Sequence, residues 1–449
     1  MNLTSLISLF NTQVPRYTSY PPVPLWKNTV TSADWKKNLL HKKDEIQKNG
    51  ISLYIHLPFC EQLCTYCGCN KRITVNHQVE KPYINALLRE WQHYTEILGK
   101  ITIRQIHLGG GTPTFFSPSQ LEFLLSEILK HAQLSVDFQG SVEIHPHFSK
   151  KEHLKTLRKF RFDRISIGIQ DLDEKVQKAI NRTQSLSEVE QLTLFSRNSG
   201  YNSVNYDLIY GLPFQTRQGL ETTIDHVLRL QPDRIAFYSY AHVPWIKASQ
   251  RKFTEKDIPD AYQKTELYLA GRFLLLDAGF QEVGMDHFAL PSDELFIARQ
   301  NHTLTRNFMG YTVMLSPFLI GLGASSISDS GDMYVQNIRD VELYQESVNR
   351  DIPVFRSHVV TEEERNFRKH ILNIMCFFKT SWQSDDFIPK RMKNNPEWDT
   401  ILKYGLVKCS ENELQVTDRG KLFLRNICYA LDTEGRLHEK SQPIYSKAI

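Results

Sequence analysis

The sequence predicts an α/β protein with a parallel sheet, followed by a smaller and mostly helical C-terminal region. Between residues 51 and 240, runs rich in β-branched and aromatic residues alternate with polar or glycine-rich corners and with segments of helical periodicity. After residue 240 this alternation gives way to longer helical segments. The chain has 449 residues, more than the roughly 250–300 that one hydrophobic core accommodates. We therefore expect an N-terminal arm (1–50), a sheet domain with a helical extension (51–355) and a C-terminal domain (356–449).

Six runs have the composition of strands, at 51–56, 103–108, 141–144, 164–169, 204–209 and 234–240. Because they alternate with helical segments, they imply a parallel sheet with right-handed crossovers, either open or curled into a barrel. Ligand sites of such folds lie at the carboxyl ends of the strands. The residues at these ends are unusually polar: His56, the segment 109–114, Glu143, Gln170, Asp207 and His242. Singly, each is more often a helix cap or a strand-end hydrogen bond, but on consecutive strands they favour a functional site.

Beyond the sheet we expect helices at 262–277 and 341–350, joined by glycine-containing loops that include 321–323. In the C-terminal region the sequence predicts a helix at 361–378, then short elements, and a final helix that begins near 418 and runs through Tyr429. This order is similar to a winged-helix domain. DNA binding would rest on that analogy alone, and 54 basic against 50 acidic residues give no nucleic-acid footprint, so we expect no nucleic-acid partner.

Cysteine usage and hydropathy indicate a cytoplasmic protein. Four of the seven cysteines are clustered and three are scattered, which is a poor disulfide framework and suits a reducing compartment. The apolar patch at 6–10 has no basic region before it, so it does not resemble a secretory signal. The longest apolar stretch, 313–324, is shorter than the roughly 18 residues that a membrane span needs.

The clustered cysteines are Cys60, Cys64, Cys67 and Cys69. Thiolates at these spacings can reach one soft metal centre from a single loop. A structural zinc site or an ordinary four-iron cluster takes four protein ligands, whereas the C-x3-C-x2-C spacing delivers three and leaves one iron open for a small molecule. We therefore expect Cys60, Cys64 and Cys67 to be ligands and Cys69 not to be one. A zinc knuckle and a disulfide clip are the alternatives.

The cysteine loop, the segment 54–59 before it and Tyr66 within it resemble the radical S-adenosylmethionine (SAM) enzymes. The resemblance implies a four-iron four-sulfur cluster whose open iron binds SAM, and a 5′-deoxyadenosyl radical released by one-electron reduction. It also implies an electron-donating reductase, flavodoxin or ferredoxin as partner. The glycines 109–111 would let SAM approach the main chain. Glu143 and Asp207 suit ribose hydroxyls or the ammonium group, and Arg182 suits the carboxylate.

Further motifs are similar to those of the oxygen-independent coproporphyrinogen III oxidases: the segments 16–21, 67–71, 107–114, 168–171, 181–182, 207–213, 240–242, 284–289 and 425–428. They cover nearly the whole chain. The resemblance implies a partial (β/α)6 barrel, a monomer, and two SAM molecules. By position, the first SAM would contact Tyr54, Gly110, Glu143 and Ile327. The second would contact Tyr66, Gly111, Thr112, Gln170, Arg182, Asp207 and Ala241.

The reaction implied is the oxidative decarboxylation of two propionates of coproporphyrinogen III to vinyl groups, which gives protoporphyrinogen IX in haem biosynthesis. Three departures from the family pattern lie near the expected site: His145 replaces an aspartate, Met309 replaces a glutamine, and the segment 313–318 is apolar instead of polar. The alternatives are another haem-active radical SAM enzyme, the related haem chaperone and a zinc-stabilised scaffold. The chaperone usually lacks both the Cys-x-Cys ending and the long terminal domain that this chain has.

Overall fold

The computed structural model describes residues 3–313, 316–383, 388, 392, 395–432 and 445–448. Its main feature is a twelve-stranded sheet in the order β16-β15-β14-β13-β1-β4-β5-β6-β7-β8-β10-β9. The six expected strands lie side by side in it and are all parallel. They are β1 (Ile51–Leu57), β4 (Ile101–Gly110), β5 (Ala132–Ile144), β6 (Phe162–Gln170), β7 (Ser203–Tyr210) and β8 (Arg234–Ser239).

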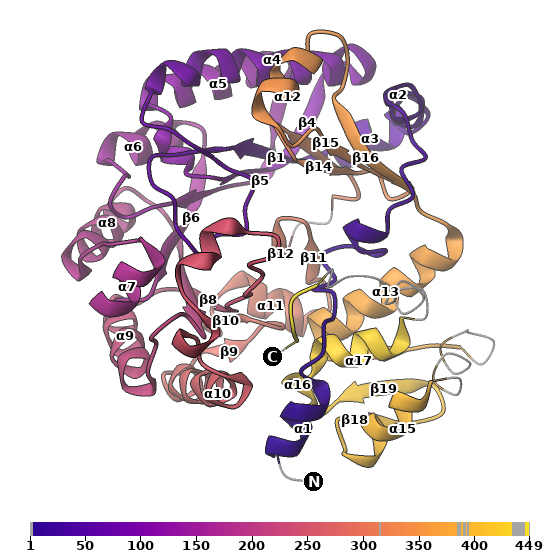
Figure 1. Cartoon of the computed structure of the whole chain (residues 1–449). Helices are drawn as coiled ribbons and strands as arrows, with labels where there is room; N and C mark the ends of the chain where they lie inside the picture. The colour runs from indigo at the N-terminus through magenta and orange to yellow at the C-terminus, as the bar shows by residue number, and fades with distance from the viewer. Residues whose placement is uncertain are drawn as a thin grey trace.

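The parallel strands curve around a central space and the helices lie outside them (Figure 1). These outer helices are α4 (Glu80–Leu98), α5 (Pro118–Lys130), α6 (Lys151–Lys159), α7 (Glu174–Ile180), α8 (Leu186–Asn198), α9 (Arg217–Arg229) and α10 (Ala261–Asp277). The sheet does not close on itself, because β16 and β9 form two separate edges. The architecture is therefore the predicted partial barrel, and the expected helix at 262–277 is confirmed as α10.

Local sequence explains why the elements form. Helix α9 begins after Thr216, whose hydroxyl accepts a hydrogen bond from the Gly219 amide, and it buries Leu220, Ile224 and Val227 on one face. Strand β1 is buried along almost its whole length, as expected for a parallel strand covered on both faces. Its apolar run therefore shows the continuous pattern of a parallel strand instead of alternation.

The region after residue 280 contains more strand than the sequence predicts. Strand β13 (Leu319–Leu322) pairs in parallel with β1, and β14 (Ile327–Asp329), β15 (Met333–Asn337) and β16 (Val354–Val359) extend it antiparallel. The prediction of a loop at 321–323 is therefore wrong for residues 321 and 322, which belong to β13. A Cβ on Gly321 would lie 2.5 Å from the Ile327 carbonyl oxygen, so this glycine lets two neighbouring strands approach closely.

Other element boundaries differ from the expected ones by smaller amounts. Strand β5 begins at Ala132, well before residue 141. The helix expected at 341–350 is α12 (Val341–Ser347). The opposite edge of the sheet carries two short antiparallel strands, β10 (His287–Ala289) and β9 (Gln281–Glu282).

The C-terminal region is a small helical domain with a three-stranded antiparallel sheet, in the winged-helix-like arrangement predicted. Its elements are α13 (Glu362–Phe377), β17 (Lys379–Ser381), α15 (Pro396–Lys403), β18 (Val407–Cys409), β19 (Glu413–Val416), α16 (Asp418–Lys421) and α17 (Leu424–Leu431). The expected helix 361–378 is confirmed as α13. The expected final helix is divided into α16 and α17.

The N-terminal arm contains α1 (Leu3–Phe10), α2 (Ser32–His41) and α3 (Lys43–Asn49). Its first part does not join the barrel core: Leu6, Phe10, Tyr17 and Tyr20 belong to the same hydrophobic cluster as α13 and α17. The domain limits at 50/51 and 355/356 stay a prediction. None of the helices in the described part of the chain is long and apolar enough to cross a membrane.

Candidate active site

The cysteine loop is anchored first by the glycine-rich corner at the end of β4. The Gly111 amide donates to the Leu57 carbonyl (2.8 Å), and the Thr112 amide donates to the Phe59 carbonyl (2.9 Å). Two short strands, β2 (Phe59–Cys60) and β3 (Arg72–Ile73), pair in parallel at the start and end of the loop. A Cβ on Gly111 would lie 2.6 Å from the Pro58 carbonyl oxygen, so glycine is required there for packing as well.

A second anchor comes from the end of α7. Asn181 has a left-handed backbone (φ 51°), and its side-chain amide donates to the Leu63 carbonyl at 2.8 Å. The Thr65 amide donates to the Ile180 carbonyl at 3.0 Å. From the sequence, Asn181 is expected only as part of the motif 181–182, although an asparagine directly after a helix is a typical left-handed cap.

A third anchor comes from the segment after β8. The Ser249 hydroxyl donates to the Thr65 carbonyl (3.1 Å), and the Gln250 amide donates to the carbonyls of Tyr66 (3.2 Å) and Ala241 (3.1 Å). Gln250 is buried. Nothing in the sequence pattern marks this glutamine, because its partners are backbone carbonyls that are remote along the chain.

A cavity of about 270 Å³ lies at the carboxyl ends of the parallel strands. It brings together eleven of the fourteen expected site residues, namely Cys60, Cys64, Tyr66, Cys67, Gly110, Gly111, Thr112, Glu143, Gln170, Arg182 and Asp207. Cys69 also lines this cavity.

The other three expected residues, Tyr54, Ala241 and Ile327, lie outside the lining. Tyr54 stacks on His107 with ring centroids 5.8 Å apart, directly behind Glu143. Ala241 is tied to the cysteine loop through Gln250. Ile327 packs at the edge of the cluster around Trp26 and Tyr334.

The two carboxylates of the cavity have opposite pKa shifts. Burial acts to raise the pKa of Glu143, but hydrogen bonds from His107 (3.3 Å) and from the Gly110 amide (3.3 Å) outweigh it, so this pKa is lowered. Burial and the charge of Glu143 raise the pKa of Asp207 to about 6, against hydrogen bonds from Ser166 (2.9 Å) and Asn205 (2.9 Å). Glu143 therefore supplies an ionised carboxylate over a wide pH range.

Arg182 is the buried cation of the cavity. It is 7% exposed, donates to the Gly168 carbonyl and lies 3.7 Å from the Cys64 sulfur. Its Nε–H is buried and has no partner among the residues that the structure describes, which suits an anionic ligand in the cavity. Gln170, beside it, has a left-handed backbone (φ 67°) at a bulge between β6 and β7, and this bulge turns its side chain into the cavity.

The donor set fits an iron–sulfur cluster better than a single ion. Among the residues that the structure describes, no three His, Cys, Asp or Glu side chains lie close enough together to hold one metal ion. Cys60, Cys64 and Cys67 instead surround a shared space, and a four-iron cluster holds its thiolates farther apart than one ion does. The Cys67 pKa is lowered to about 5, first by a hydrogen bond from Cys69, whereas burial raises that of Cys60 to about 11.

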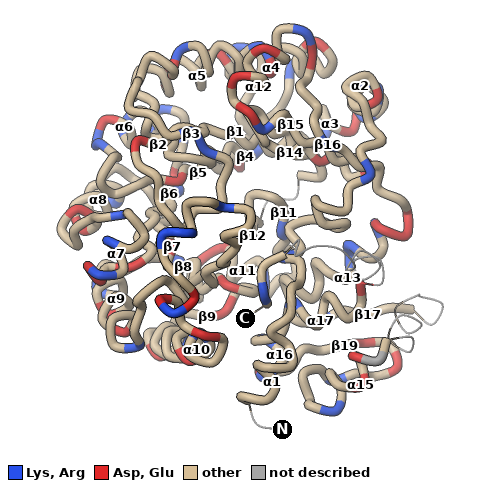
Figure 2. Tube along the Cα trace, in the orientation of Figure 1, with Lys and Arg blue, Asp and Glu red and all other residues tan. Residues whose placement is uncertain are grey.

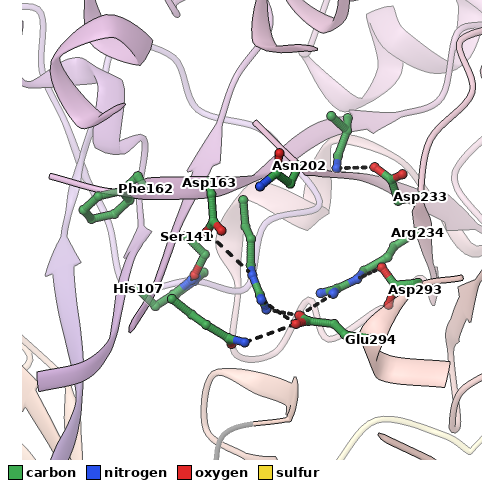
Figure 3. A network of polar contacts seen from close by, with 12 residues as sticks. His107, Ser141, Phe162, Asp163, Asn202, Asp233, Arg234, Asp293 and Glu294 are labelled. Atoms are coloured by element: carbon green, nitrogen blue, oxygen red, sulfur yellow. Dashed lines mark hydrogen bonds and ion pairs between the residues drawn. The ribbon is translucent and has the colours of Figure 1, made fainter. Parts of the chain in front are cut away.

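A second cavity of about 150 Å³ continues into the barrel and shares Glu143 and Asp207 with the first. Its floor is an ion-pair network (Figure 3). Arg234 pairs with Asp293 (2.6 Å) and with Glu294 (2.7 Å) at the start of α11 (Glu294–Gln300), and Arg164 also pairs with Glu294. Because Arg164 and Arg234 stand near the start of β6 and β8, the network lies at the end of the barrel opposite the cysteines.

Two of the three departures from the family pattern line the cavities. His145 lines the cysteine cavity, and burial, with the charge of Arg182, lowers its pKa to about 2, so it is neutral. Met309 lines the inner cavity, in the turn between β11 (Thr305–Asn307) and β12 (Gly310–Thr312). Residues 314 and 315 of the apolar segment 313–318 lie outside the described residues.

The barrel, the three-cysteine loop and the glycine corner define a radical SAM protein, and residues 54–227 match the radical SAM superfamily. More particularly, the chain belongs to the oxygen-independent coproporphyrinogen III oxidase family. It is 37% identical over 439 residues to the oxygen-independent coproporphyrinogen III oxidase of Pseudomonas aeruginosa, covering 95% of both chains. It is 34% identical to that of Escherichia coli, covering 99% of this chain and 98% of the other.

A solved structure gives the same result. Coproporphyrinogen III oxidase from Escherichia coli, described as a radical SAM enzyme, superposes with a TM-score of 0.88 at 33% identity. The superposition covers 94% of this chain and 100% of that one. The barrel and the C-terminal region are therefore both part of the family architecture. Membership of the family implies a four-iron four-sulfur cluster and SAM as cofactors.

Proposed function

We propose that this protein oxidatively decarboxylates coproporphyrinogen III to protoporphyrinogen IX. Each of two propionates loses one hydrogen atom, carbon dioxide and one electron, which a separate electron acceptor takes up, and becomes a vinyl group. The observation that carries the proposal is the cavity in which three cysteines face Glu143, Arg182 and Asp207 in a chain of this family. The protein is accordingly an oxidoreductase of porphyrin biosynthesis.

Cys60, Cys64 and Cys67 would hold the cluster, and Cys69 would not. When bound, the cluster and SAM supply a 5′-deoxyadenosyl radical, which can abstract hydrogen from an unactivated carbon. Two SAM molecules would bind. Glu143, with Tyr54, Gly110 and Ile327, belongs to the first site. Asp207 and Arg182 belong to the second site, together with Tyr66, Gly111, Thr112, Gln170 and Ala241.

The chain's own residues bind and orient these groups. Arg182, whose Nε–H has no partner within the described part of the chain, pairs with a carboxylate inside the cavity. Glu143, ionised because His107 and the Gly110 amide hold its pKa low, accepts hydrogen bonds from hydroxyl or ammonium donors. Asp207 does the same above about pH 6. The hydrogen bonds of Asn181 and Gln250 to backbone carbonyls fix the cysteine loop. The ion pairs of Arg234 lie at the opposite end of the barrel, below the site.

The remaining expectations complete the proposal. The protein acts as a cytoplasmic monomer and receives electrons from a reductase, a flavodoxin or a ferredoxin. No nucleic acid takes part. His145 and Met309 adjust the surroundings of the substrate and leave radical generation intact, because neither is among the proposed cluster or SAM ligands.

The experiment is an anaerobic assay of the reconstituted protein with coproporphyrinogen III, scoring vinyl products and 5′-deoxyadenosine. We expect both products, two SAM molecules bound per chain, and one fewer in Glu143→Ala and in Asp207→Ala. Cys60→Ser should lose iron while Cys69→Ser, its control in the same loop, keeps it. Formation of 5′-deoxyadenosine without vinyl product would point to another haem-active radical enzyme. Zinc in place of iron and sulfide would refute radical chemistry altogether.

A further inference from the structure

Three basic side chains gather where the cysteine cavity opens: Lys71, Lys247 and Arg339, which we call the basic rim. Lys71 lines the cavity and donates to the Cys67 carbonyl at 3.0 Å. The Arg339 carbonyl accepts from the Asn70 side chain at 2.8 Å, so its residue is held beside the end of the cysteine loop.

Lys247 comes from a different part of the chain. It precedes Ser249 and Gln250, the two residues that hydrogen-bond the carbonyls of Thr65 and Tyr66. The segment is therefore fixed against the cysteine loop. Burial, and then the charge of Lys71, lower the pKa of Lys247, and Arg339 acts in the same direction, so the three cations lie within electrostatic range of one another.

The basic rim lacks an acidic partner within the described ranges of the chain: no carboxylate there lies within ion-pair distance of its three side chains. This differs from the neighbouring Arg72, which pairs with Glu342 at 2.9 Å. Figure 2 shows basic positions beside β3 and on the segment that crosses the front of the barrel. Like charges held together at a cavity mouth attract anions into it.

Apolar side chains accompany the charges. Trp245 and Ile246 directly precede Lys247, and they are 47% and 57% exposed. Lys71 and Lys247 are half-buried and Arg339 is exposed, and Lys71 lines the cavity itself. An anion with an apolar body fits this combination of cations and exposed apolar side chains.

We propose that the basic rim binds carboxylates of the tetrapyrrole substrate, with Trp245 and Ile246 against its macrocycle. The inference rests on the proposed function, since the four propionates of coproporphyrinogen III supply the anionic groups. Two propionates are retained in the reaction, so the rim can hold carboxylates that stay on the product while others are positioned at the cavity.

The test compares Lys247→Gln and Arg339→Gln with Lys252→Gln, an exposed lysine of the same segment that lies outside the rim. Turnover is measured with dithionite as reductant, which bypasses a protein donor. We expect KM for coproporphyrinogen III to rise about tenfold in each rim variant, as for the loss of one partly exposed charge-assisted hydrogen bond. We expect unchanged kcat and iron content, and no effect in Lys252→Gln.

Binding provides a second readout that does not depend on turnover. Fluorescence titration with coproporphyrin III should show the same tenfold weakening in the rim variants, whereas the uncharged tetramethyl ester should bind all variants alike. Normal KM and binding in the rim variants would overturn the proposal. So would a defect seen only with reduced flavodoxin, because the rim would then dock an acidic electron donor. A wild type that binds coproporphyrin III through the rim without forming vinyl product would refute the proposed function alone.

Discussion

At the scale of single residues, the two cavity carboxylates differ because their partners differ. Glu143 accepts from a histidine and from a backbone amide, and its pKa falls. Burial, and then the charge of Glu143, raise the pKa of Asp207 to about 6, because the hydrogen bonds from neutral side chains offset them only in part. Such separation of two nearby acids is typical of functional sites.

Asp207→Asn should stabilise the cofactor-free protein at neutral pH. Because the pKa of Asp207 rises from 3.8 to about 6 on folding, the folded state holds this proton more tightly and loses stability as the pH rises between these values. The loss is at most about 3 kcal/mol, and less because the side chain faces an open cavity. We therefore expect a gain of roughly 1–2 kcal/mol at pH 7–8 that disappears near pH 4.

Chemical denaturation of the apo protein at the two pH values measures this gain. Asp225→Asn, at an exposed position of α9, is a control for the loss of one negative charge. An equal gain at pH 4 and pH 8 would contradict the titration argument and indicate a packing effect.

Most of the cavity lining could be predicted from the sequence because the residues follow consecutive strand ends. The repeat of the βα units predicts a strand end at Glu143, Gln170 and Asp207, and all three line the cavity. Gln250 could not be found this way. It donates to the backbone carbonyl of Tyr66 in the cysteine loop, which lies 184 positions earlier in the chain. Such contacts leave no local pattern in the sequence.

At the scale of elements, the cysteine loop depends on the end of α7. Asn181→Ala would remove the hydrogen bond to Leu63 and place alanine in a left-handed conformation. We expect a loss of about 1–3 kcal/mol in stability and a lower iron content after reconstitution. Gln231→Ala is the matched control, because Gln231 has a similar φ of 52° and lies away from the loop. Iron retention equal to that of the wild type would show that the loop is held without the Asn181 side chain.

The strands that follow residue 310 show where prediction from sequence fails. Strands β13 to β16 are three to six residues long, and β13 carries a glycine in its interior. Short runs of this kind are not distinguishable from loops by periodicity. What makes them strands is the exposed edge of β1, with which β13 pairs. By contrast, the long βα units were predictable because each carries its own strand and helix pattern.

At the scale of the whole molecule, the two ends of the chain are packed together. Arg425, in α17, donates to the carbonyls of Val14 and Pro15, and to those of Lys447 and Ala448 near the other terminus. Tyr17 and Tyr20 donate to Asp432, each at 3.0 Å. The sequence suggested none of the contacts that Arg425 and Asp432 make with the N-terminal arm, because they join residues some 400 positions apart.

Arg425→Lys should therefore loosen the N-terminal arm. Lysine keeps the positive charge but cannot reach several carbonyls with a fixed fork, and each buried carbonyl left without a donor costs about 1–3 kcal/mol. We expect hydrogen exchange and early proteolysis to increase within residues 3–20, where α1 lies. Arg350→Lys, at an exposed position, should change neither hydrogen exchange nor proteolysis.

Iron content should stay at the wild-type level, because the contacts that hold the cysteine loop come from β4, α7 and residues 249–250. If iron is lost together with protection of the arm, then the arm supports the site through the barrel, and the independence argued from these contacts is wrong.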